Sequence, residues 1–91
     1  MARAEWTFLS NHGHVLVCLA RDPDVRMRDV AEAVGITERA VQQIVRDLVE
    51  HGYVQRDKVG RRNRYVVLRD AHFRHDLESE LTLGDFLDLV T

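Results

Sequence analysis

Four polar side chains recur at helical spacing in the middle of the chain: Arg39, Gln42, Gln43 and Arg46. Positions i, i+3, i+4 and i+7 share one face of an α-helix, so these side chains would form a stripe about two turns long. Arginine pairs with the O6 and N7 atoms of guanine, and glutamine pairs with N6 and N7 of adenine. The chemistry available to this stripe is hydrogen bonding to base edges in a DNA major groove.

The same stripe also fits an ordinary solvated helix face, because arginine and glutamine are both good helix formers. Asp47 and Glu50 lie further along the same stretch and would repel phosphate. That arrangement fits a helix whose C-terminal end points away from a nucleic acid. Spacing alone therefore leaves base reading and a solvated surface as alternatives.

A cationic segment follows the stripe and favours the first alternative. Residues 56–69 carry six basic and one acidic side chain, a net charge of +5, although the whole chain has a net charge of −2. Residues 70–91 carry one basic and six acidic side chains, a net charge of −5. A polyanion responds to local charge rather than to the total. The basic residues expected at the tip of the cationic segment are Lys58, Arg61, Arg62 and Arg64, with Arg56 and Arg69 at its base.

The stripe requires a helix, which the sequence predicts over residues 38–51 with Thr37 as its N-cap. A shorter helix is expected over residues 28–34, and Gly35 can end it in the left-handed conformation. A mostly buried helix is expected before these two, and Pro23 stops it. Thr37 and the backbone N–H groups beside it are also placed to touch a phosphate.

Strand-like runs at residues 53–59 and 64–68 flank Gly60-Arg61-Arg62-Asn63, which predicts a β-hairpin with its turn at those four residues. Val25-Arg26-Met27 is a further short extended candidate. Near the C-terminus, Thr82 begins a pattern that resembles a capping box. An apolar stripe with helical spacing follows it, made of Leu83, Phe86, Leu87 and Val90. The sequence therefore ends with a predicted amphipathic helix.

A helix-turn-helix needs a small residue where its helices cross, a glycine in the turn, and apolar residues on the second helix that pack back. The pattern Ala-x3-Gly-x5-Val-x2-Ile supplies these types in the predicted order. The residues concerned are Ala31, Gly35, Ile36, Val41 and Ile44. With the basic hairpin that follows, residues 12–69 resemble the winged helix-turn-helix transcription regulators of the MarR and ArsR groups.

The resemblance implies an α+β fold, mainly α: a winged helix-turn-helix with a two- or three-stranded wing sheet and a C-terminal helix. It implies a recognition helix at residues 38–51 in the major groove and a basic wing at residues 56–69 on the backbone or minor groove. The expected function is sequence-specific binding of double-stranded DNA as a transcriptional regulator, and more narrowly as a repressor. The residues expected to bind DNA are Thr37, Arg39, Gln42, Gln43, Arg46, Lys58, Arg61, Arg62 and Arg64.

Regulators of this kind bind two-fold operators as dimers, so a homodimer is expected here. Its interface would use the N-terminal segment, residues 1–9, together with the C-terminal helix. Trp6, Phe8 and Leu9 make that segment too apolar for a free tail. The alternative function is a winged-helix module for protein interaction or assembly without DNA readout. A cationic wing distinguishes the two, because a protein-binding module does not need one.

The 91 residues are expected to form one winged-helix domain, with residues 70–91 as an acidic C-terminal tail that contains a helix. Cys18 is the only cysteine, so an intramolecular disulfide is excluded. It lies in an apolar run, where a buried inert thiol is favoured over a redox sensor. No apolar run approaches the ~20 residues of a membrane span and no signal pattern begins the chain, so a cytoplasmic protein is expected.

The histidines suggest a metal sensor as a further alternative. His72 and His75 have a chelating spacing, and Asp70 or Asp76 could add oxygen ligands. The thiolate pairs common in such sensors are absent from the sequence, so no metal and no cofactor is expected. Catalytic motifs such as a Gly-rich phosphate loop or a Ser/His/Asp pattern are also absent, and the chain is not expected to be an enzyme. An effector site would lie at a subunit interface, because a chain this short has little room for an internal pocket.

Overall fold

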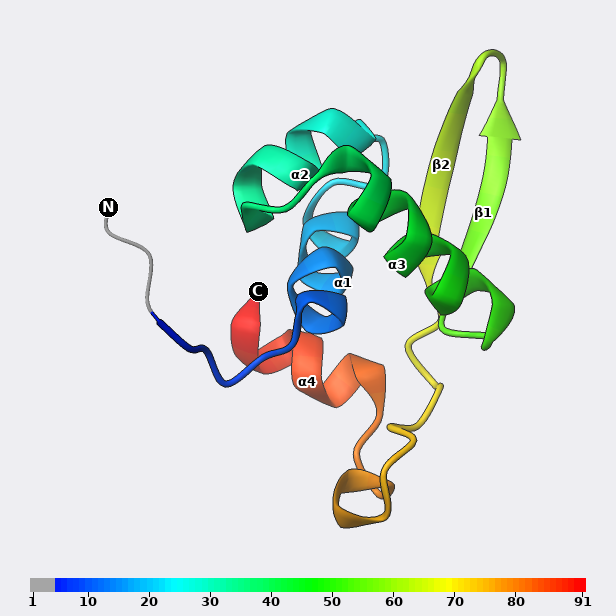
Figure 1. Ribbon diagram of the computed structural model, residues 1–91. Helices are drawn as coiled ribbons and strands as arrows, with labels where there is room; N and C mark the ends of the chain where they lie inside the picture. Colours follow the sequence, from blue (N-terminus) through cyan, green and yellow to red (C-terminus); the bar gives the residue numbers. More distant parts are fainter. Residues whose placement is uncertain (1–4) are drawn as a thin grey trace.

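The computed structural model describes residues 5–91. Met1 to Ala4, which begin the N-terminal segment expected to pack on the domain or on a second copy, lie outside that range. The elements follow in the order α1 (Asn11–Arg21), α2 (Met27–Val34), α3 (Glu38–Glu50), β1 (Val54–Val59), β2 (Arg62–Val67), η1 (Asp76–Glu78) and α4 (Leu83–Val90). Figure 1 shows α2 and α3 packed around α1, the β1–β2 hairpin projecting beside α3, and α4 at the other end of the molecule. The expected mainly helical winged helix-turn-helix fold is confirmed.

Local capping signals set the helix-turn-helix as the sequence predicts. Gly35 ends α2 in the left-handed conformation with φ at 88°, where a side chain would be strained. The Thr37 hydroxyl then accepts a hydrogen bond from the Ala40 N–H at 3.0 Å and begins α3. At α1, the Ser10 hydroxyl accepts in the same way from Gly13. The direction of α3 relative to α2 therefore depends on two residues of the turn.

The hairpin turn is shorter than the sequence predicts. Val59 pairs with Arg62, so only Gly60 and Arg61 form the turn, and Arg62 and Asn63 belong to β2. Gly60 has φ at 64°, the conformation that a tight two-residue hairpin turn needs at its start. Because a strand alternates its faces, this shift of boundary places Arg62 and Asn63 on opposite faces of the wing.

The prediction of a short strand at Val25-Arg26-Met27 is wrong. The Val25 N–H bonds to the Asp22 carbonyl and curls the backbone, and Met27 is already the first residue of α2. One backbone hydrogen bond, from the Tyr65 N–H to the Pro23 carbonyl at 2.9 Å, lies where a third strand would pair. The wing sheet of the described chain consequently has two strands.

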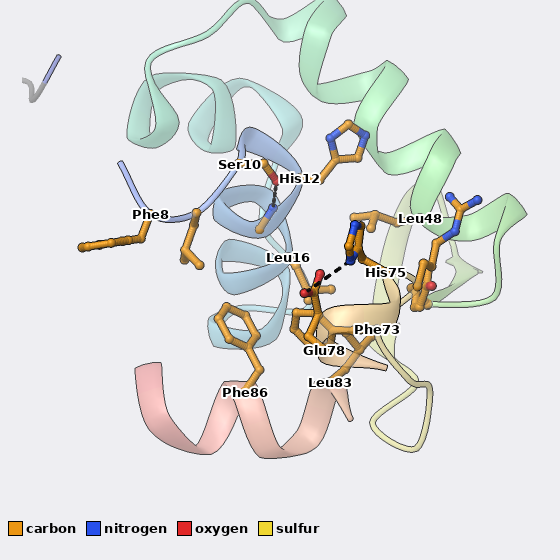
Figure 2. A pocket seen from close by; sticks show the side chains of 14 residues that line it. Phe8, Ser10, His12, Leu16, Leu48, Phe73, His75, Glu78, Leu83 and Phe86 are labelled. Carbon is orange, nitrogen blue, oxygen red and sulfur yellow. Dashed lines mark hydrogen bonds and ion pairs between the residues drawn. The ribbon is translucent and has the colours of Figure 1, made fainter. Parts of the chain in front are cut away.

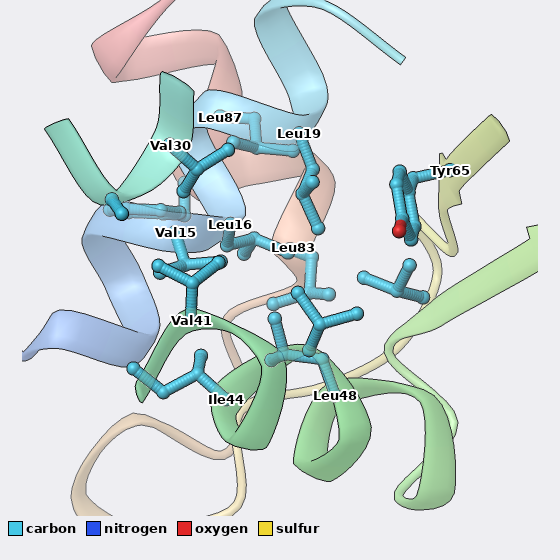
Figure 3. Packing of buried hydrophobic residues seen from close by; sticks show 14 residues of the cluster. Val15, Leu16, Leu19, Val30, Val41, Ile44, Leu48, Tyr65, Leu83 and Leu87 are labelled. Carbon is cyan, nitrogen blue, oxygen red and sulfur yellow. The ribbon is translucent and has the colours of Figure 1, made fainter. Parts of the chain in front are cut away.

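One apolar cluster joins all four helices to the base of the wing (Figure 3). Its most deeply buried side chains are at most 1% exposed and come from α1, α2, α3 and α4: Val15, Leu19, Val30, Val41, Val45 and Leu87. Burying an aliphatic side chain of this size stabilises the fold by about 1.5–3 kcal/mol. Val54 and Tyr65 extend the cluster into the two strands, so the wing rests on the same core as α3.

Backbone hydrogen bonds that the sequence does not reveal fold the acidic tail back on itself and join the start of α4 to Arg69, just after β2. Phe73 donates to the Leu81 carbonyl, Leu83 to Ala71, and Gly84 to the Arg69 carbonyl at 2.9 Å. A Cβ at Gly84 would lie 3.2 Å from the Arg69 oxygen, so the close approach favours glycine. The Thr82–Asp85 capping box is present as predicted. These bonds bring α4 against α1 and close the core.

Replacement of Leu87 by alanine should test whether α4 is part of the domain core. Leu87 is 1% exposed, so Leu87→Ala should lower the free energy of unfolding by about 2–5 kcal/mol through lost burial and a cavity. Leu89 on the same helix is 83% exposed, and Leu89→Ala should change it by less than about 0.5 kcal/mol. Urea unfolding at low protein concentration measures both. If both variants change the free energy of unfolding by the same small amount, α4 does not pack in the core.

Candidate nucleic-acid interface

The stripe on α3 is exposed because the other side of the helix is committed to the core. Val41, Ile44, Val45 and Leu48 are all buried. The stripe residues on the other side border a shallow hollow on the outside of the helix. Its lining consists of Thr37, Arg39, Ala40, Gln42, Gln43 and Arg46. Five of the nine predicted DNA-binding residues thus share one continuous surface.

The four stripe residues divide into two free and two restrained side chains. Arg39 and Gln42 have no side-chain hydrogen bond or ion pair within residues 5–91. Gln43 instead donates its amide N–H to Asp47 Oδ1 at 3.1 Å and accepts a hydrogen bond from Arg46 at 3.3 Å. Arg39 and Gln42 can therefore reach a base edge without breaking an internal contact, whereas Gln43 would first have to release one.

Asp47 connects the stripe to the start of α1. The His12 Nε2–H donates to Asp47 Oδ2 at 2.9 Å, across 35 positions of sequence. Hydrogen bonds from His12 first, and from Gln43 second, hold the pKa of the Asp47 carboxyl below its ordinary value of 3.8. The carboxylate is therefore ionised at neutral pH. It repels phosphate directly, and it also fixes the rotamer of Gln43, which the sequence did not indicate.

Thr37 lies at the N-terminal end of the stripe, where the backbone of α3 begins. Its hydroxyl oxygen accepts from Ala40, which leaves the hydroxyl proton for an outside acceptor. Helix N-termini also favour anions through their free N–H groups and the helix dipole. This geometry is compatible with the expected phosphate contact at Thr37.

The strand register separates the basic residues of the wing onto two faces. Arg56 pairs with Tyr65 and Lys58 pairs with Asn63, so these four residues share the face that carries the buried Tyr65 ring. The opposite face carries Asp57, Arg62 and Arg64. The sequence predicted Lys58, Arg61, Arg62 and Arg64 as one cluster at the tip, but the structure brings only Lys58 and Arg61 next to the turn without internal partners in the described chain.

Arg62 and Arg64 instead meet Asp24 in the loop between α1 and α2. The Arg62 guanidinium donates to the Asp24 carbonyl oxygen at 2.7 Å, and Arg64 Nε lies 3.8 Å from the Asp24 carboxylate. All three side chains are exposed, so the ion pair contributes little to stability. Its effect is geometric, because it ties the wing to the helical core on the face away from α3.

Arg56 and Asn63 were not among the residues expected to bind DNA, yet both border a hollow between the wing and α3. The other lining residues are Met27, Gln42, Val45, Arg46 and Tyr65. The sequence placed Arg56 at the base of the hairpin and Asn63 in its turn. Alternation counted from Val54 to Arg56 and Lys58 would have indicated which basic residues point inward. The facing of Asn63, in contrast, can be assigned only once the turn is known to end at Arg61, because the sequence had placed Asn63 in the turn.

The remaining candidate groups make local contacts. His72 Nδ1 donates to the Ser79 carbonyl, and His75 Nδ1 accepts from the Leu77 N–H. Across residues 5–91, no group of three or more His, Cys, Asp or Glu side chains has an arrangement that could hold a metal ion. Partial burial raises the pKa of the Cys18 thiol, which disfavours the reactive thiolate. None of the described helices has the length and apolar character of a membrane span.

Comparisons with known proteins agree with this geometry. Residues 7–63, more than half of the chain, match the model of the MarR family. The solved structure of T. potens IscR superimposes with a TM-score of 0.62 at 14% sequence identity, covering 96% of this chain and 90% of that chain. At that identity the likeness shows the fold alone. A search of curated proteins finds no match.

The Asp47 contacts predict a specific loss of stability in acid. A carboxyl whose pKa is lowered by folding stabilises the folded state above its unfolded pKa, and this contribution disappears as the pH falls through the lower folded pKa. Asp47→Asn should therefore lower the melting temperature most above about pH 5, and the difference from the unmodified protein should shrink below about pH 4. Thermal unfolding between these conditions measures it. Glu50→Gln, on the same helix, is the matched control, and a difference that ignores pH would contradict the prediction.

Proposed function

We propose that this chain, which belongs to the MarR family, recognises specific sequences of double-stranded DNA and represses transcription by occupying them. The family supports DNA binding and transcription regulation in general terms. The observation that carries the finer proposal is the exposed stripe on α3, with Arg39 and Gln42 free of internal contacts in the described chain. Repression needs no further surface, because a protein bound over a promoter excludes the transcription machinery.

In the proposed complex α3 lies in the major groove, which admits one helix. Arg39 and Gln42 lie in the N-terminal half of α3, the part that meets base edges in helix-turn-helix proteins. Each bidentate pair contributes about 1–3 kcal/mol of discrimination against a wrong base. Gln43 reads a base from a position that Asp47 restrains, and Arg46 lies at the far end of the stripe. Thr37 contacts a phosphate at the start of the helix.

The wing supplies salt-sensitive affinity in this proposal. Lys58 and Arg61 lie at the turn and contact the backbone or the adjacent minor groove. Arg62 and Arg64 add positive charge and hold the wing at Asp24, so that its tip keeps one position relative to α3. If one subunit neutralises about four phosphates, log K falls by about 3.6 for each tenfold rise in salt. The acidic α4 lies at the opposite end of the molecule from the wing tip (Figure 1), which keeps its charge away from the DNA.

A homodimer is the second part of the proposal, with the N-terminal segment and α4 at its interface. The Trp6 and Phe8 rings pack edge to face with centroids 5.2 Å apart, yet Trp6 is 69% exposed and Phe8 is 94% exposed. On α4, Leu89 is 83% exposed. Exposed aromatic pairs of this kind are typical of surfaces that another protein covers.

An apolar groove beside the N-terminal segment offers the complementary surface. Its lining includes Phe8 together with Leu16, Phe73, Leu83 and Phe86, and Figure 2 shows the Phe8 ring extending outward at the edge of the groove. Because the Phe8 ring borders the groove but stays 94% exposed and leaves it open, we assign the groove to the N-terminal aromatic residues of a second copy. In a two-fold dimer, the Trp6–Phe8 pair of each subunit would then occupy the groove of the other subunit.

The base-reading and backbone roles predict different responses to mutation. Arg39→Ala and Gln42→Ala should each cost about 1–3 kcal/mol at the preferred site and relax the sequence selected there. Lys58→Ala and Arg61→Ala should weaken all sequences alike, and each should reduce the salt slope by about 0.9. Selection from random DNA, followed by affinity measurements at several salt concentrations, distinguishes the two patterns.

Arg21→Gln is the control for a loss of one positive charge, since that guanidinium donates to the Val90 carbonyl at the end of α4. It should leave both the selected sequence and the salt slope unchanged. Equal weakening of every sequence by Arg39→Ala would remove the base-reading role. Absence of salt-sensitive DNA binding in the unmodified protein would instead favour the protein-interaction module.

Trp6 is the only tryptophan and reports directly on the proposed dimer. Its fluorescence should shift to shorter wavelength as protein concentration rises, because the exposed ring enters an apolar groove. Phe8→Ala should move that transition to higher concentration, whereas Leu77→Ala, which also removes an exposed apolar side chain, should not. Light scattering on the same samples gives the mass. A monomer mass at tens of micromolar protein would refute the dimer.

A further inference from the structure

We propose that the hollow between α3 and the wing binds one phosphate of the DNA backbone through Arg46, Arg56 and Asn63. This inference rests on the proposed function, because it requires α3 to lie in the major groove. It adds two residues, Arg56 and Asn63, to the predicted DNA-binding set. It also assigns Arg46 to the backbone rather than to a base.

Strand register brings the wing residues to the hollow. Arg56 is the partner of the buried Tyr65, and Asn63 lies two residues before Tyr65 on β2, so both side chains belong to the face that looks toward α3. From the helix, Gln42 and Arg46 reach the same hollow one turn apart. Two separate elements therefore contribute donors to one concave surface.

The chemistry of the lining favours an anion. Its polar residues are two arginines and two carboxamides, and no carboxylate is among the residues that line it: Met27, Gln42, Val45, Arg46, Arg56, Asn63 and Tyr65. Tyr65 is 4% exposed and Val45 is 1% exposed, so the floor is held rigidly by the core. Two guanidinium groups near one another repel unless an anion lies between them. A phosphate accepts from both guanidinium groups at once.

Most of the donors around the hollow have no internal partner in the described part of the chain. The Arg56 side chain and the Asn63 amide make no hydrogen bond or ion pair to any other residue from 5 to 91. Arg46 uses one guanidinium nitrogen on Gln43 and keeps the rest of its five N–H donors. By contrast, Arg62 and Arg64 on the opposite wing face are already engaged by Asp24. The free cations and the engaged cations of the wing therefore lie on different faces.

The position of the hollow selects DNA phosphate over a small free anion. Gln42 and Arg46 border both this hollow and the outer hollow of the stripe, so the two surfaces are continuous along α3. A helix in the major groove is flanked by sugar–phosphate strands, and the wing stands directly beside α3 (Figure 1). A phosphate clamped there would fix the depth and register of α3, and the free side chains of Arg39 and Gln42 would then meet defined bases.

Single phosphates of a selected binding site can be neutralised one at a time as methylphosphonates to test the proposal. Neutralising one particular phosphate in each half-site should lower the DNA affinity of the unmodified protein by about tenfold. Neutralising the same phosphate should lower the affinity of the Arg56→Gln variant by less than about twofold. Arg46→Gln should lose the same sensitivity, and Arg56→Gln should lower the salt slope by about 0.9. The Asn63→Ala variant should lose less of its sensitivity to that phosphate than Arg56→Gln does, because it removes only a neutral hydrogen-bond donor.

Arg21→Gln is the matched control and should keep full sensitivity at every phosphate, and circular dichroism melting confirms that each variant is folded. If Arg56→Gln remains as sensitive as the unmodified protein at every position, the phosphate site is wrong while DNA binding stands. If Arg46→Gln changes the selected base sequence and not the phosphate response, Arg46 reads a base and the assignment fails. If the unmodified protein does not bind DNA, the proposed function fails and this site fails with it.

Discussion

The burial of one face of α3 is the constraint on which the rest of the structure depends. Val41, Ile44, Val45 and Leu48 must leave water together, and this fixes the rotation of the helix about its own axis. The residues between them are then exposed whatever their chemistry. The same core holds Val54 and Tyr65 at the base of the wing, so α3 and the wing pack on one common core. This packing sets the spacing between α3 and the base of the wing, and the contacts of Arg62 and Arg64 with Asp24 hold the wing further along the hairpin.

A second constraint, the alternation of strand faces, distributes the charge of the wing. Counting basic residues treats the segment from 56 to 69 as one patch of +5. The paired strands divide it into an inner face with Arg56 and Lys58 and an outer face with Arg62 and Arg64. Asp24 engages only the outer pair. The outer face of the wing is therefore held by Asp24, and the inner face is free to contact an anion. The net charge of the segment does not reveal this division.

The features that the sequence predicted well are those set by neighbours in the chain. The Thr37 cap, the left-handed Gly35 and the apolar face of α3 each depend on a few adjacent residues, and all were predicted. The errors and omissions involve distant partners or single-residue boundaries. His12 meets Asp47 across 35 positions, and Arg62 meets Asp24 across 38, so no local pattern indicates either contact. The turn at Gly60 was predicted two residues too long, and this error hid the inward direction of Asn63.

The contacts of Asp47 explain why a carboxylate is tolerated on the helix proposed to read DNA. Asp47 lies one turn beyond Gln43, and it accepts hydrogen bonds from that amide and from His12. Its charge opposes phosphate, but the same charge orders Gln43 and, through Gln43, Arg46. Ordering a long side chain before binding saves conformational entropy of about 0.5–1.5 kcal/mol per side chain that would otherwise oppose the complex. The repulsion acts through solvent and is weakened by salt, whereas the hydrogen bonds from Gln43 and His12 are local contacts that salt affects less.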